Sequence, residues 1–218
     1  MVENILYIAA AYLLGSVPFG YIAGRLNGID LREHGSKNIG ATNTFRVLGK
    51  AWGIPVFICD VLKGLLPVLA MKLHLGADFA DCSAVEMGWL IGTLMAAVLG
   101  HTFTCFLKFK GGKGIATALG ALIAFSPAIA AVALAVWLCS MVCTRYVSLS
   151  GILAAVGVET ATLYLCLQDG DCSAADVVAL SFITLLVVLV IVKHRSNVTR
   201  LLNGTEPQAF SKKKNTQA

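Results

Sequence analysis

The chain is poor in charge. Of its 218 residues only 13% are Asp, Glu, Lys or Arg, whereas 57% are hydrophobic, and the mean hydropathy is +0.79. A water-soluble domain of this size cannot bury so much apolar surface, but a bundle of membrane helices can keep it in lipid. The composition therefore excludes an ordinary soluble domain and predicts an all-α integral membrane protein.

Several motifs are also absent. The 7 cysteines form no CxxC pair and no Cys/His spacing typical of a metal site, and neither an acidic metal-binding box nor a Ser-His-Asp pattern occurs. We therefore expect no metal and no cofactor. The sequence contains no internal repeat, which disfavours a transporter built from inverted repeats. Glu3 stands where a signal peptide would be basic, so we expect no cleaved signal peptide.

Long apolar runs indicate the membrane helices. The stretch 114–145 is too long for one crossing and carries Ser126-Pro127 near its middle. It is either two helices, 114–125 and 127–145, or one kinked helix. The other runs long enough to span a membrane are 4–24, 52–73, 87–107, 149–167 and 175–193.

The distribution of charge decides between these two topologies. Lys and Arg gather in 25–51, in 108–113, at Arg145 and in the tail from Lys193. The segments 74–86 and 168–176 carry acidic residues and no Lys or Arg. Because basic loops stay in the cytoplasm, the pattern predicts seven transmembrane helices, with the N-terminus outside and the C-terminus cytoplasmic. Six helices would place 108–113 outside.

The basic turn at 108–113 precedes the short helix predicted at 114–125. Its neighbouring glycines, Gly111 and Gly112, allow successive backbone N–H groups to converge, and Lys113 adds a full positive charge. A helix N-terminus and a glycine-rich turn together favour the binding of a phosphate. The alternative is a charge cluster that only fixes the topology.

Three further polar clusters lie on the predicted cytoplasmic side. Each has a plain alternative: a capped connecting loop, an interface anchor or a solvated helix face. Together they offer cations, hydroxyls and amides without a strong nucleophile, which suits a phosphorylated substrate that arrives already activated. Their candidate residues are Ser36, Lys37, Asn38, Thr42, Asn43 and Arg46 in the first, Ser148 in the second, and His194, Arg195 and Asn197 in the third, where Arg200 shares the same helical spacing.

Ionisable residues inside the predicted spans usually face the interior of a bundle. Asp60 and Lys63 lie three residues apart on one helix face and can pair. Glu159 lies in the middle of a later helix, and His101 lies near the cytoplasmic end of another. A structural role and a functional role explain Asp60, Lys63 and Glu159 equally well.

Seven short blocks of the sequence form a joint pattern: 15-GSVPFG-20, 35-GSKNIGATN-43 with Arg46, 60-DVLKG-64, 100-GHTFTCFLKFKGGKGIAT-117, 145-RYVSL-149, 193-KHRSN-197 and 200-RLLNGTE-206. With these blocks the chain closely resembles a known family, the bacterial integral-membrane glycerol-3-phosphate acyltransferases of the PlsY type, which use acyl-phosphate as donor. The H-x4-D signature of the common glycerolipid acyltransferases is absent. The resemblance implies a seven-helix fold and no use of acyl-CoA.

The resemblance also implies roles for the polar residues. It places Ser36, Arg46, Lys113, His194 and Asn197 at catalytic positions. It places Lys37, Asn38, Thr42, Asn43, Gly111, Gly112, Ser148 and Arg195 at positions that bind the substrate or its phosphate. Either His194 or a phosphate of the substrate removes the hydroxyl proton, and we favour the substrate.

The reaction implied is transfer of a fatty acyl group to the 1-hydroxyl of glycerol 3-phosphate, the first step of phospholipid synthesis. The alternative is a small transporter of phosphate or phosphorylated lipid precursors. We expect residues 1–205 to form the membrane domain and 206–218 a disordered cytoplasmic tail. The partners expected are acyl-phosphate, glycerol 3-phosphate and membrane lipid, without nucleic acid.

Three expectations concern the protein's setting. We expect a monomer in a bacterial inner membrane, with its active site facing the cytoplasm. Cys82 and Cys172 are the only cysteines in the predicted outer loops, where an oxidising periplasm would permit a disulfide. Two free thiols are favoured over a bridge, because nothing in the sequence makes these loops neighbours.

Overall fold

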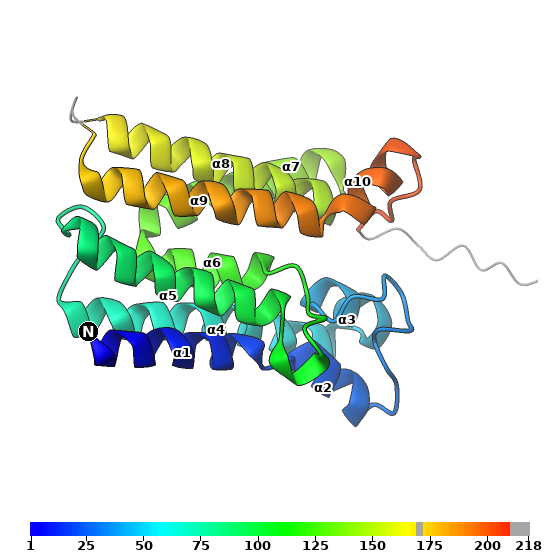
Figure 1. Cartoon of the computed structure of the whole chain (residues 1–218). Helices are drawn as coiled ribbons and strands as arrows, with labels where there is room; N and C mark the ends of the chain where they lie inside the picture. The colour runs from blue at the N-terminus through cyan, green and yellow to red at the C-terminus, as the bar shows by residue number, and fades with distance from the viewer. Residues whose placement is uncertain (169–171, 210–218) are drawn as a thin grey trace, which may run out of the picture.

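A computed structural model describes residues 1–168 and 172–209. Within these residues the regular structure is entirely helical (Figure 1). The helices are α1 (Val2–Ser16), α2 (Phe19–Leu26), α3 (Ala41–Leu48), α4 (Lys50–Leu75), α5 (Ala84–Thr102), α6 (Ile115–Phe125), α7 (Pro127–Thr144), α8 (Val147–Leu167), α9 (Ala174–Lys193) and α10 (Arg195–Leu202), with a 3₁₀ turn, η1 (Cys105–Leu107).

Six helical segments of the described chain are long and apolar enough to cross a membrane, so the prediction of a multi-pass helical membrane protein is confirmed. Two helices replace the long apolar stretch 114–145, because α6 ends at Phe125 and Pro127 opens α7 at its first position, where proline is tolerated. At 11 residues, α6 is only about 16 Å long. Seven crossings therefore stay a prediction.

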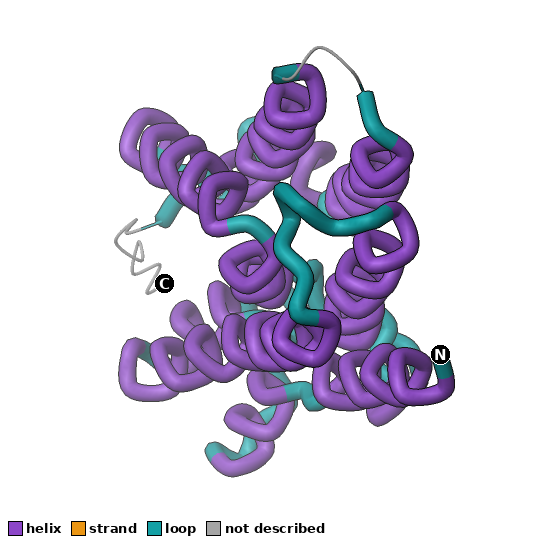
Figure 2. The backbone as a smooth tube through the Cα atoms, turned by 90° about the vertical axis from the view of Figure 1, so that its left-hand side faces the viewer, coloured by secondary structure: helices purple, strands orange, loops and turns teal. Residues whose placement is uncertain are grey.

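The long helices form two layers (Figures 1 and 2). In Figure 1 α7, α8 and α9 lie above α1, α4, α5 and α6. The N-terminus, the α4–α5 loop and the start of α9 lie at one end of the bundle. The short helices α2, α3 and α10 lie at the other end. The basic segments therefore share one end, opposite the acidic α4–α5 loop.

Glycines bring α6 close to α4. A Cβ atom added to Gly64 would lie 1.9 Å from the Thr117 carbonyl oxygen, and one added to Gly120 would lie 1.9 Å from the Val61 carbonyl oxygen. Small residues at such positions let helix backbones approach in lipid, where dispersion contacts replace the hydrophobic effect between helices. The short helix is therefore held by backbone contact along α4.

The span predicted at 4–24 corresponds to one candidate membrane span, Val2–Leu26, but this span is not one continuous helix. The chain leaves the helical conformation at Val17 and resumes it at Phe19. Pro18 explains the break, because proline lacks an N–H group and disfavours the helical conformation of the residue before it. The break turns α2 away from α1 at the basic end of the bundle (Figure 1).

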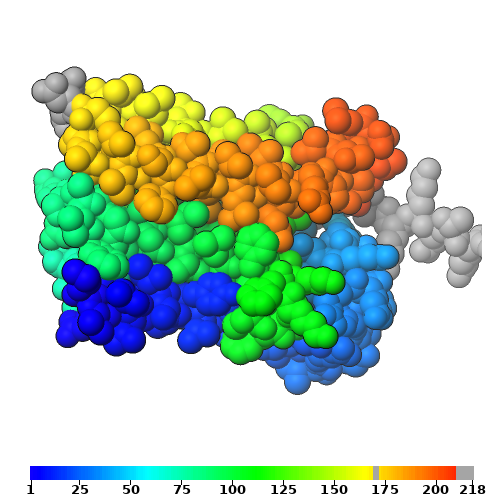
Figure 3. Space-filling model, in the orientation of Figure 1, coloured from blue at the N-terminus to red at the C-terminus, as the bar shows by residue number. Residues whose placement is uncertain are grey.

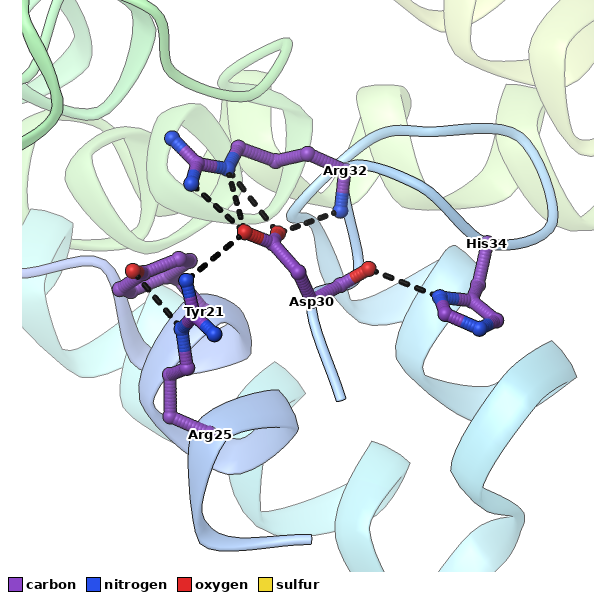
Figure 4. A network of polar contacts seen from close by, with 5 residues as sticks. All are labelled: Tyr21, Arg25, Asp30, Arg32 and His34. Atoms are coloured by element: carbon purple, nitrogen blue, oxygen red, sulfur yellow. Dashed lines mark hydrogen bonds and ion pairs between the residues drawn. The ribbon is translucent and has the colours of Figure 1, made fainter. Parts of the chain in front are cut away.

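The loop that follows α2 is folded around Asp30 (Figure 4). This carboxylate accepts hydrogen bonds from the Arg25 Nη2 atom at 3.1 Å and from the Arg32 Nη2 atom at 2.6 Å. The bonds from Arg32 hold the pKa of Asp30 at about 2. The Tyr21 hydroxyl accepts a bond from Arg25, and the His34 ring lies 2.9 Å from the Asp30 carbonyl oxygen. This network fixes the path of the chain toward α3.

Candidate active site

A cavity of about 650 Å³ lies between the two helix layers at their basic end. Its two ends differ in chemistry. The polar end is lined from the α2–α3 loop, α3, the α5–α6 turn and the last described residues. The other end is lined by apolar side chains of α6, α7, α8 and α9, which include Leu119, Leu122, Leu134, Trp137, Val158, Leu186 and Val190.

Glu206 lies at the centre of the polar end. Its carboxylate accepts hydrogen bonds from Ser148 Oγ at 2.6 Å, from Asn197 Nδ2 at 2.7 Å and from Arg200 Nε at 2.7 Å. The Asn197 side-chain oxygen in turn accepts a bond from the Lys113 ammonium. Three segments far apart in the sequence, at Lys113, at Ser148 and at 197–206, therefore converge on one cluster. Figure 3 shows the orange-red surface of α10 and the residues after it at the same end of the molecule.

The same contacts correct the boundary expected for the tail. A disordered segment beginning at residue 206 does not fit a Glu206 whose side chain is only 7% exposed and accepts hydrogen bonds from three side chains. Pro207 also lines the cavity. The rest of the predicted tail, 210–218, lies outside the described residues.

Burial shifts the protonation of the cluster. Desolvation, followed by repulsion from Arg200 and Arg46, lowers the pKa of Lys113 to about 8 despite attraction to Glu206. Desolvation and the nearby Lys113 charge lower the pKa of His194 to about 4. Burial works against the Glu206 carboxylate, but its three hydrogen bonds lower its pKa. At neutral pH the site therefore holds an ionised lysine, an ionised glutamate and a neutral histidine.

The first predicted cluster reaches the cavity from the α2–α3 loop and α3. Ser36, Lys37, Asn38, Thr42 and Arg46 all line it. Arg46 lies in the last turn of α3 and is exposed, so its guanidinium remains available to an incoming anion.

Asn43 also lines the cavity, but its side chain holds the loop together. Its amide nitrogen donates to the carbonyl oxygens of Leu31, His34 and Asn38, and its side-chain oxygen accepts a bond from the Ser36 N–H. These bonds use its donors and an acceptor. Asn43 therefore positions the residues predicted to bind the substrate.

The glycine turn differs from the expected phosphate cradle. The Gly111 N–H donates to the Thr102 carbonyl oxygen at 3.2 Å, and the Gly112 N–H donates to the His101 carbonyl oxygen at 3.0 Å. Neither glycine lines the cavity. Both N–H groups are therefore already engaged within the turn, and a role of these two amides in binding a phosphate stays a prediction. The turn offers an anion the Lys113 ammonium and the free N–H groups at the start of α6.

The residues of the third predicted cluster differ in burial and in their contact with the cavity. His194 and Asn197 are buried and line the cavity, whereas Arg195 is exposed and does not. Arg200 of the same cluster also lines the cavity, and so does Glu206, which was not among the candidates. Helical spacing offers a signal for Arg200, three residues after Asn197 on one face of α10. Glu206 follows the helix and has no such periodicity.

Ser148 lies in the first turn of α8 and donates to Glu206. Cys82 and Cys172 are both free thiols. Glu159 accepts a hydrogen bond from Thr184 at 2.6 Å, which joins α8 to α9 away from the cavity. This contact gives Glu159 a structural partner.

Comparison with known proteins gives one consistent result. The family model described as glycerol-3-phosphate acyltransferase matches residues 5–204. A glycerol-3-phosphate acyltransferase of Bacillus cereus (strain G9842) is 42% identical over 215 residues, which cover 98% of this chain and 99% of the relative. One from Synechocystis sp. (strain ATCC 27184 / PCC 6803 / Kazusa) is 44% identical over 92% of this chain and 88% of the relative.

Two solved structures share the fold. The crystal structure of PlsY (YgiH), an integral membrane glycerol 3-phosphate acyltransferase, in its glycerol 3-phosphate form, has a TM-score of 0.82 and is 39% identical, covering 95% of this chain and 96% of that one. The lysophosphatidic acid form of PlsY has a TM-score of 0.79 and is 38% identical, with 94% and 95% covered. Both similarities extend over nearly the whole chain.

Proposed function

The chain belongs to the glycerol-3-phosphate acyltransferase family of the PlsY type, and from this premise we propose that its acyl donor is acyl-phosphate. The products are then 1-acyl-glycerol 3-phosphate (lysophosphatidic acid) and inorganic phosphate, at the first step of phospholipid synthesis. One observation carries the proposal: a single cavity joins a cationic polar end to an apolar end among the helices. This shape suits a phosphorylated head and a fatty acyl chain bound together.

The reaction needs no covalent enzyme intermediate. Acyl-phosphate is a mixed anhydride, so its carbonyl carbon is already activated. The 1-hydroxyl oxygen of glycerol 3-phosphate attacks that carbon, the bond from carbon to the phosphate oxygen breaks, and phosphate leaves. Arg46 and Lys113 hold the phosphates and offset the developing negative charge. Ser36 and Asn197 orient the bound substrates.

The proton of the hydroxyl passes to a substrate phosphate. His194 Nδ1 lies 2.8 Å from the Val190 carbonyl oxygen, so this nitrogen donates and Nε2 carries the lone pair. A pKa of about 4 makes the ring a weak base, and a base works best when its pKa is near the working pH. A phosphate oxygen with a pKa of about 6 is better matched. His194 then accepts a hydrogen bond from the substrate.

A phosphate-release assay tests the proposed reaction. We expect the purified protein in detergent to release inorganic phosphate from acyl-phosphate only when glycerol 3-phosphate is present, with 1-acyl-glycerol 3-phosphate formed in equal amount. Acyl-CoA in place of acyl-phosphate should give no product. Uptake of glycerol 3-phosphate into proteoliposomes without phosphate release would overturn the proposal in favour of a transporter.

We further propose a monomer in a bacterial inner membrane, with seven crossings and the cavity open to the cytoplasm. Charge supports this orientation, because the basic end of the bundle contains the cavity and the acidic α4–α5 loop lies at the other end. In this topology the short α6 is itself one of the seven crossings, and it starts at the α5–α6 turn on the cytoplasmic side.

Cysteine labelling tests this orientation. In variants that keep one native cysteine each, an impermeant maleimide applied to intact spheroplasts should label the exposed Cys172. The exposed Cys105 of η1, at the basic end, should react only after the membrane is opened. Labelling of Cys105 in intact cells would reverse the orientation.

The lowered pKa of Lys113 predicts a pH dependence. Because this pKa is about 8, the ammonium loses its proton as the pH rises through 8, and kcat/KM of the free enzyme should fall there. Arginine stays protonated throughout this range. In Lys113→Arg any remaining activity should therefore lose the decline, as measured by pH profiles of kcat/KM from pH 6 to 10. A decline at the same pH in both proteins would assign it to another group.

A further inference from the structure

Three ionisable side chains lie buried within the transmembrane helices, away from the Glu206 cluster. Asp60 and Lys63 of α4 are each 2% exposed, and His101 of α5 is 6% exposed. Charged groups at this depth are costly and require a partner or a role. Asp60 and His101 also line the cavity, so the group lies beside the proposed substrate site.

Lys63 and Asp60 form a buried ion pair. The Lys63 ammonium lies 2.8 Å from Asp60 Oδ1 and donates to the Val17 carbonyl oxygen at 2.8 Å. The ammonium also lies 5.5 Å from the centre of the Phe19 ring. This pair joins α4 to the break between α1 and α2. Its two opposite charges would offset each other without a third ionisable group.

His101 is the third member, and it faces two ways. Its Nδ1 atom lies 3.6 Å from Asp60 Oδ1. Its Nε2 atom faces the glycine turn, because a Cβ atom added to Gly112 would lie 2.1 Å from it. The imidazole is therefore packed between the Asp60 carboxylate and the backbone of the residue that precedes Lys113.

The backbone of the same region is joined directly. The Gly112 N–H bonds to the His101 carbonyl oxygen, and the Gly111 N–H bonds to that of Thr102. The Thr102 carbonyl oxygen is also 3.4 Å from the Lys193 ammonium. The end of α5 thus fixes the position and the direction of the turn that leads into Lys113.

We propose that His101, braced by Asp60, is a positioning residue that sets the place of the glycine turn and so of the Lys113 ammonium. Gly112 lacks a side chain because the imidazole occupies that space. This inference rests on the proposed function, in which Lys113 holds a substrate phosphate. It explains why the turn requires a glycine pair although neither glycine reaches the cavity.

A rescue experiment tests the contact between the ring and the turn. In Gly112→Ala the new methyl group collides with the imidazole and displaces the turn. A displacement of about 1 Å can cost about a hundredfold in rate, and we expect a loss of kcat/KM of that order. His101→Ala should cost less, about tenfold, because it loosens the turn without pushing it. The double variant should regain about tenfold over Gly112→Ala, because the methyl group then fits where the ring was.

Gly111→Ala is the matched control. A Cβ atom there would lie 2.0 Å from the His101 carbonyl oxygen, which every substitution of the side chain leaves in place. His101→Ala should therefore not rescue Gly111→Ala. Asp60 is left unchanged in this test, because its removal would leave Lys63 as an unpaired buried charge and threaten the fold.

The outcomes separate this inference from the proposed function. Thermal unfolding of each variant in detergent checks that it folds. Rescue at Gly112 without rescue at Gly111 supports the positioning role. If the wild-type protein releases phosphate but the effects of His101→Ala and Gly112→Ala simply multiply, the positioning role is overturned and the proposed function stands. If the wild-type protein itself releases no phosphate, the proposed function fails first.

Discussion

Replacement of Lys113 by alanine should lower kcat/KM by about a hundredfold or more, with the helical bundle intact. Its ammonium is the cation at the start of α6, and it donates to Asn197 beside the Glu206 carboxylate. Removal leaves the cavity with less positive charge at the position where a phosphate and the developing oxyanion would bind. Phosphate release by the purified variant measures the loss, and size-exclusion chromatography shows whether the fold survives.

Lys110→Ala is the matched control for this variant. Lys110 lies in the same turn, three residues before Lys113, but is exposed and does not line the cavity. Its loss should change kcat/KM less than about threefold, because water and salt screen the interaction of an exposed charge with the bound substrate. A folded Lys113→Ala protein that turns over at nearly the rate of the Lys110→Ala protein would remove Lys113 from the site.

Much of the fold follows from local physics and could therefore be predicted. Apolar runs long enough to cross a membrane identify the long helices. Ser126-Pro127 divides α6 from α7, because proline is tolerated at the start of a helix and not within it. The Val17-Pro18 pair carries the same signal, although the apolar character of 4–24 hides it. The break in the helix was therefore missed where a helix-breaking proline lies inside an apolar run long enough to cross a membrane.

The candidate site was predictable in its residue types but not in its contacts. Lys113, Ser148 and Asn197 do meet, as the clustering of their motifs at one end of the bundle suggested. Glu206 could not be placed, since its partners come from α8 and α10, which only the tertiary fold brings together. The hydrogen bonds of the glycine amides could not be predicted for the same reason: their acceptors belong to the end of α5.

The depth of the site depends on how closely α6 packs on α4, and Gly120→Ala should disrupt it. The new Cβ atom would lie 1.9 Å from the Val61 carbonyl oxygen, and a backbone atom within a helix cannot move aside as a flexible side chain can. We expect a loss of about 3 kcal/mol or more in stability, seen as a fall in the midpoint of thermal unfolding in detergent. Catalytic activity should fall with it, because α6 follows directly from Lys113.

Gly88→Ala separates this steric effect from the general effect of replacing a helical glycine. Gly88 lies in α5, and a Cβ atom added there meets no atom within 4 Å. Alanine also favours a helix over glycine by up to about 1 kcal/mol, so this variant should be as stable as the wild type or slightly more stable. If Gly120→Ala unfolds at the same temperature as Gly88→Ala, the backbone contact with α4 does not hold α6 in place. The position of Lys113 would then depend on the end of α5 alone.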